Sequence, residues 1–111
     1  MTHGFQDAVS LELGRRTAAL LRASPGLVGV AHENLERWSR LNADSPSLLR
    51  CYSEWQAILT QPLEAVCDLL CAETDEAQRL RQNSPFVGVL SPAEVWEIKR
   101  QFRQLSANGV W

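Results

Sequence analysis

Serine–proline dipeptides divide this 111-residue chain into short segments. Four of its five prolines follow a serine, at positions 24–25, 45–46, 84–85 and 91–92. A serine side chain accepts a hydrogen bond from the free N–H groups at the start of a helix, and proline is favoured at the first helical position. The fifth proline, Pro62, disfavours a helical conformation at the residue before it. The prolines therefore predict a series of short helices with well-marked starts.

Apolar residues recur at helical spacing between these boundaries. In the second segment Leu27, Ala31, Leu35, Trp38 and Leu41 are spaced by three or four residues and fall on one face. No alternating pattern typical of a strand extends beyond 86–90. The expected helices span Asp7 or Ser10 to Ala23, Pro25 or Val30 to Leu41, Pro46 to Thr60, Pro62 to Ala72, Asp75 to Gln82, and Pro92 to Leu105.

These segments predict an all-α fold, a compact bundle of five or six short helices with an apolar loop before the last one. The length and the 45% hydrophobic and 22% charged content are typical of one soluble domain over 1–111, with flexible tails expected at 1–6 and 107–111. Charge is uneven, since residues 1–78 carry −5 and residues 79–111 carry +3. The sequence therefore predicts an acidic body and a basic C-terminal helix.

The cysteines and histidines indicate neither a metal site nor a catalytic site. Cys67 and Cys71 are four residues apart on one expected helix, but a zinc site needs about four ligands, and only Cys51, His3 and His32 remain. Cys67 lies on the apolar side of its helix, where a free cysteine packs as a small hydrophobic residue. We expect no metal, no cofactor and no enzymatic activity.

The cysteine count also bears on location. Three cysteines without a recognisable signal peptide favour a reducing compartment over a disulfide framework. No apolar run approaches the ~20 residues that span a bilayer. The expected location is the cytoplasm.

The apolar loop Pro85–Leu90 lies directly before the last helix. Ser91 and Glu94 form a capping box around Pro92, so the helix start itself needs no further explanation. Two interpretations of the loop remain open. It folds back and closes the end of the bundle, or it forms an apolar surface that another protein covers, with Arg79 and Arg81 at the rim.

The candidate functional residues are therefore surface residues. The candidates for contact with a partner protein are Arg81, Phe86, Val87, Leu90, Trp96 and Arg100. An alternative uses the basic side of the last helix, Lys99, Arg100 and Arg103, to contact nucleic acid. The connection Asn83–Ser91 is longer than the three- or four-residue turn of a helix-turn-helix, which favours the protein partner.

The segment 79–92, together with Glu54-Trp55 and 34–38, resembles a group of small, mostly uncharacterised helical bacterial proteins associated with toxin–antitoxin-like gene pairs. The resemblance covers about residues 30–102 and implies no catalytic residues. It implies a non-enzymatic helical protein that binds, and inhibits or regulates, a partner such as the product of a neighbouring gene. The partner's identity and the oligomeric state stay open.

Overall fold

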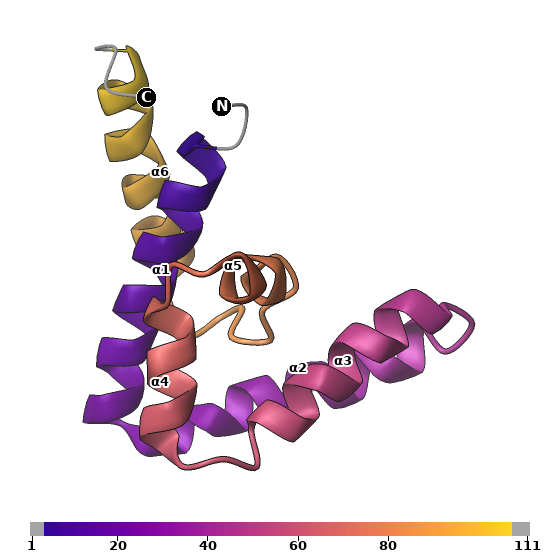
Figure 1. The fold of residues 1–111 in the computed structure, drawn as a ribbon. Helices are drawn as coiled ribbons and strands as arrows, with labels where there is room; N and C mark the ends of the chain where they lie inside the picture. Colours follow the sequence, from indigo (N-terminus) through magenta and orange to yellow (C-terminus); the bar gives the residue numbers. More distant parts are fainter. Residues whose placement is uncertain (1–3, 108–111) are drawn as a thin grey trace.

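Six α-helices and one 3₁₀ helix make up residues 4–107, the part of the chain that the computed structural model describes (Figure 1). No strand occurs among these residues, so the prediction of an all-α fold is confirmed. The elements are α1 (Gly4–Ala23), η1 (Pro25–Leu27), α2 (Val28–Leu41), α3 (Pro46–Ile58), α4 (Leu63–Cys71), α5 (Asp75–Arg81) and α6 (Pro92–Ala107).

Helix α1 connects the other parts of the fold. Both α4 and α6 lie along it, each running in the opposite direction to α1 (Figure 1). Helices α2 and α3 form an antiparallel hairpin that extends to one side, and α5 with the loop 82–91 occupies the angle between the two arms (Figure 1). The molecule measures 42 × 33 × 26 Å. The last helix therefore depends on α1 for its position.

Proline begins three helical segments as predicted, at positions 25, 46 and 92. The serines before the first two make no side-chain cap bond, and Ser84-Pro85 lies in a loop. Ser91 Oγ accepts from Glu94 N at 3.1 Å, while Ser91 N donates to Glu94 Oε1 at 3.3 Å, which confirms the capping box. Thr74 Oγ1 caps α5 by accepting from Ala77 N. Three ends differ from the prediction by two residues or more, since α1 already begins at Gly4, α3 ends at Ile58 and α6 continues to Ala107. The remaining residues of the two expected tails, 1–3 and 108–111, lie outside the described residues.

The main hydrophobic cluster is built around Trp55 of α3, which is fully buried. Its indole meets Phe86 edge to face, with ring centroids 6.0 Å apart, and its Nε1 donates to Leu80 O at 3.0 Å. A buried tryptophan needs such a partner for its N–H group. The other buried members are Ala18, Leu21, Ala31, Leu35, Tyr52, Leu59, Val66, Cys67, Leu70 and Leu80. Trp55 thus joins α3, α5 and the loop in one core.

A second, smaller cluster joins α1 to α6. Val9, Leu90 and Ile98 are buried in it, and the partly buried residues around them are Phe5, Leu13, Leu20, Val95 and Phe102. Leu41, expected on a buried face, is 72% exposed, and Leu105 of α6 is 40% exposed. Each lies in the last turn of its helix, near the end of the arm that the helix forms (Figure 1). Helical periodicity places a residue on a face, but the neighbouring helix must extend far enough to cover it.

Candidate functional site

The loop 82–91 belongs mostly to the core. Phe86 and Leu90 are only 5% and 6% exposed, and Pro85 is buried as well. Val87 is 65% exposed, and the neighbouring Gly88 adopts φ +97°, a conformation that favours glycine. The interpretation that the loop closes the bundle is therefore right for its buried residues. The sequence had suggested that Phe86 and Leu90 contact a partner at the surface. Both lie instead inside the chain's own hydrophobic clusters.

Asn34 of α2 holds this loop in place. Its Nδ2 donates to Pro85 O at 2.8 Å and to Val87 O at 2.9 Å, and its Oδ1 accepts from Arg37 Nη2 at 2.6 Å. Asn34 is itself 5% exposed, so these bonds replace water for an otherwise buried amide. The sequence interpretation did not identify this residue. Its signal was a polar residue three positions after Ala31, on the buried stripe of α2.

Replacing Asn34 with alanine is expected to release the loop and destabilise the protein by about 1–3 kcal/mol, because two buried carbonyls lose their donor. Hydrogen–deuterium exchange at residues 85–90 should accelerate more than exchange in α1. Asn34→Asp has nearly the same shape but no amide donor, and should behave like Asn34→Ala. Gln56→Ala, at an exposed position on α3, is the control. Unchanged exchange in both Asn34 variants would show that the loop is held by Phe86 and Leu90 alone.

Arg81 is not the exposed rim charge that the sequence suggested. It is 7% exposed, and its Nη1 donates to the carbonyl oxygens of Leu69, Leu70 and Ala72 at the end of α4, at 3.3, 3.3 and 2.6 Å. Its Nε donates to Ser10 Oγ at 3.2 Å. Burial lowers the pKa of the guanidinium, although an arginine stays charged at neutral pH. Arg81 therefore caps α4 and ties it to α1 and α5.

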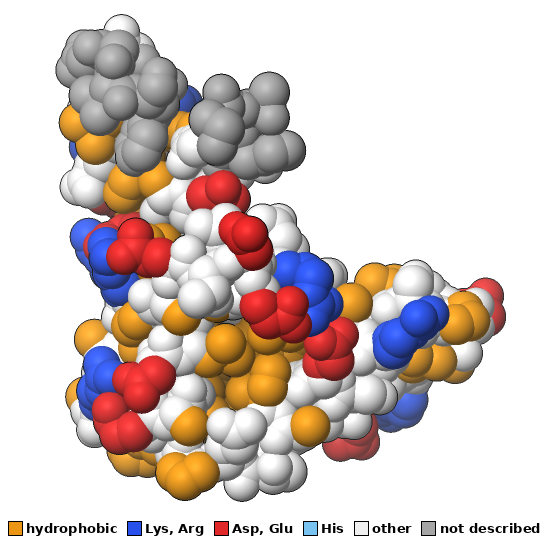
Figure 2. Space-filling model, viewed as in Figure 1, with side chains coloured by type: hydrophobic (Ala, Val, Ile, Leu, Met, Phe, Trp, Pro, Cys, Tyr) orange, Lys and Arg blue, Asp and Glu red, His pale blue; other side chains and the backbone are white. Residues whose placement is uncertain are grey.

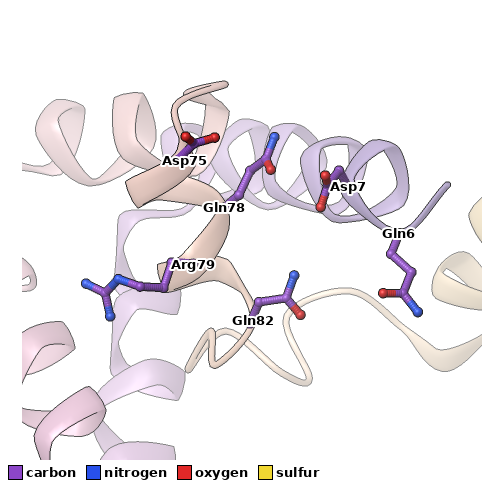
Figure 3. Close-up of a pocket in the computed structure, with 6 residues that line it drawn as sticks. All are labelled: Gln6, Asp7, Asp75, Gln78, Arg79 and Gln82. Atoms are coloured by element: carbon purple, nitrogen blue, oxygen red, sulfur yellow. The ribbon is translucent and has the colours of Figure 1, made fainter. Parts of the chain in front are cut away.

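A polar depression of about 340 Å³ lies between the start of α1 and α5 (Figure 3). The residues that line it are Gln6, Asp7, Asp75, Gln78, Arg79 and Gln82. The guanidinium of Arg79 points away from the other five (Figure 3) and pairs with Glu54 and Glu76, which lowers the pKa of both carboxyls. The lining holds two carboxylates, Asp7 and Asp75, and contains no histidine, thiol or hydroxyl.

The structure does not gather the cysteines and histidine of the described chain into a site. Across residues 4–107, no group of three or more His, Cys, Asp or Glu residues is arranged to hold a metal ion. Cys67 is buried, its Sγ lies 3.7 Å from Ala18 O, and burial raises the pKa of its thiol. His32 is exposed on α2. Cys67 is a packed core residue, as its place on the apolar stripe predicted.

The outer side of α6 carries an aromatic residue among cations. Trp96 is 60% exposed, and Lys99, Arg100 and Arg103 are exposed three, four and seven residues later, on the same side of the helix. We call these four residues the Trp96 face. Arg100 pairs with Glu97, whereas Lys99 and Arg103 make no hydrogen bond or ion pair within residues 4–107. The Trp96 face thus combines a large apolar side chain with two unpaired cations.

Comparisons with protein-family models, curated proteins and solved structures found no match to this chain. Within residues 4–107, no helix is both long and apolar enough to span a membrane.

Proposed function

We propose that this is a non-enzymatic helical interaction protein that binds, and restrains or regulates, a partner protein in the manner of an antitoxin. The Trp96 face is the proposed contact surface. The observation that carries the proposal is the 60% exposure of Trp96 beside Arg100. Tryptophan and arginine are the residues most enriched among those that dominate the energy of protein interfaces.

Covering an exposed tryptophan with apolar surface of a partner lowers the free energy of the complex. A tryptophan side chain buries 150–250 Å², so covering the exposed part of Trp96 would contribute about 2–4 kcal/mol. The cations beside it favour a partner with acidic groups around an apolar pocket, because opposite charges guide the approach of the two surfaces. Val87, the other exposed apolar residue of the predicted contact set, adds a smaller apolar contact.

The test is co-purification with the product of a neighbouring gene. Trp96→Ala is expected to weaken binding by about thirtyfold or more, since truncating a central interface tryptophan costs ~2 kcal/mol or more. The melting temperature should change little, because Trp96 lies outside both core clusters. Leu41→Ala is a matched control, since Leu41 is also exposed, by 72%, but lies at the tip of the α2–α3 hairpin.

Two results would contradict this proposal. In the first, Trp96→Ala binds the partner as tightly as the unaltered protein. In the second, Trp96→Ala and Leu41→Ala weaken binding equally, which would make the exposed apolar area, and not the Trp96 face, responsible.

A second candidate function is nucleic-acid binding through Lys99, Arg100 and Arg103. The observation that favours it is the exposure of all three cations on one side of α6. A phosphate-binding protein loses affinity steeply as salt rises, because it releases counterions. Fluorescence anisotropy with labelled double-stranded DNA at low salt tests this candidate. Binding that Lys99→Glu with Arg103→Glu abolishes but Trp96→Ala leaves intact would favour nucleic acid over a protein partner.

A further inference from the structure

An apolar groove lies outside α6, the helix that carries the Trp96 face. It has a volume of about 370 Å³ and is formed where the end of α3 meets α4 and α5. The lining residues are Ile58, Gln61, Ala65, Asp68, Leu69, Ala72 and Leu80. Hydrophobic side chains gather over this region on the face shown in Figure 2, with acidic and basic side chains side by side along their border. Ligand pockets in proteins begin at about 300 Å³, so the groove has room for an indole ring.

The surroundings of the groove are acidic. Residues 63–81 contain five acidic residues and two arginines, and one of these arginines is the buried Arg81. Asp68 lines the groove directly, and its side chain is 78% exposed. Its nearest cation, Arg22, lies 3.8 Å away and makes a closer pair with Glu64 at 3.0 Å. The groove therefore offers an apolar floor and a rim on which the carboxylates of Glu64 and Asp68 share one cation, Arg22.

We propose that this groove receives the Trp96 face of a second copy of the chain. The proposal rests on the function proposed above, because it uses the same face. Trp96 supplies the apolar group that the groove accommodates, and Lys99 and Arg103 supply cations for its rim. Within one molecule the contact is excluded, because the opposite side of α6 packs on α1 through Ile98 and Val95.

The geometry of this contact has a consequence for assembly. The groove and the Trp96 face are different surfaces, so two copies can exchange both contacts in a closed dimer or add further copies head to tail. In either case self-association rises with protein concentration. A partner that covers the Trp96 face competes for it with the groove of a second copy. Adding the partner is therefore expected to dissociate the assemblies.

Sedimentation velocity on the purified full chain tests the proposal with two blocked variants. In the groove-blocked variant, Ala65→Arg and Asp68→Arg fill the groove and reverse its rim charge. In the face-blocked variant, Trp96→Ala and Arg103→Glu remove the anchor and reverse a cation. The unaltered protein should form larger species as concentration rises and fewer at high salt. Each variant alone should associate at least about thirtyfold more weakly than the unaltered protein. A mixture of the two variants should form a one-to-one dimer.

Dimer formation in the mixture distinguishes a blocked surface from misfolding. It also tests self-association separately from the function proposed above. A one-to-one dimer requires an intact groove on one variant and an intact face on the other. An unaltered protein that stays monomeric at all concentrations, or a mixture that stays monomeric, overturns the proposal. If that monomer still captures its partner through Trp96, the function proposed above stands. If the groove-blocked variant alone loses the partner, the groove binds that partner and not a second copy.

Discussion

Gly14→Ala will destabilise the protein by about 2–4 kcal/mol, although alanine is the better helix former. A Cβ atom at position 14 would lie 2.1 Å from Leu70 O and 3.2 Å from Cδ of Arg81. The first contact is with backbone, so α1 and α4 must move apart. Helix propensity favours alanine by ~1 kcal/mol, whereas forcing atoms into a packed contact costs about 1–3 kcal/mol and sometimes more. Displacement of Arg81 from the end of α4 adds to the loss.

Urea unfolding followed by circular dichroism measures this effect, and Gly29 provides the control. Gly29 lies in α2, and a Cβ atom there meets nothing within 4 Å. Gly29→Ala should therefore stabilise the protein by about 0.5–1 kcal/mol. Two alanine substitutions in helices are then expected to have opposite signs. If both variants were stabilised, α1 and α4 would not approach each other at Gly14 as closely as described.

Arg81→Met will also destabilise the protein by about 2–4 kcal/mol. Methionine keeps most of the apolar length of the side chain and removes the desolvated charge, which favours the variant. It also removes the donor to three carbonyls at the end of α4 and to Ser10 Oγ. A buried acceptor that loses its partner costs about 1–3 kcal/mol, and several are lost here. The lost hydrogen bonds therefore outweigh the saving in desolvation.

Arg79→Met is the matched control, because Arg79 lies two residues earlier on the same helix and is exposed. Its ion pairs with Glu54 and Glu76 are solvated, so only a small change in stability is expected. Hydrogen exchange at the end of α4 should accelerate in Arg81→Met and not in Arg79→Met. Arg81→Lys should recover part of the loss, because an ammonium reaches fewer of the acceptors. Equal effects at both arginines would show that charge, and not capping, is what Arg81 contributes.

The helix starts could be predicted because their causes are local. Ser91 and Glu94 exchange hydrogen bonds across one turn, and Thr74 accepts from Ala77 three residues later. Such bonds need no other part of the chain, so they can be recognised in the sequence.

The candidate surface residues were harder to predict. Periodicity could not show whether Trp96 packs inward, because it lies next to the inner stripe of α6, and the structure exposes it. Arg81 looked like a surface charge because arginines are rarely buried unless they are paired. Its acceptors are carbonyls of α4, and their position depends on how α4 and α5 meet.

The sequence alone determined that the chain forms short helices, where most of them begin, and which faces are apolar, since these follow from hydrogen bonds and spacing within a few residues. Only the tertiary structure decided the roles of Gly14, Asn34 and Arg81, because each acts on backbone that is distant in the chain. The loop before α6 shows the difference. Its apolar composition did not decide between core and surface, and the two carbonyls that Asn34 holds show that most of it is core.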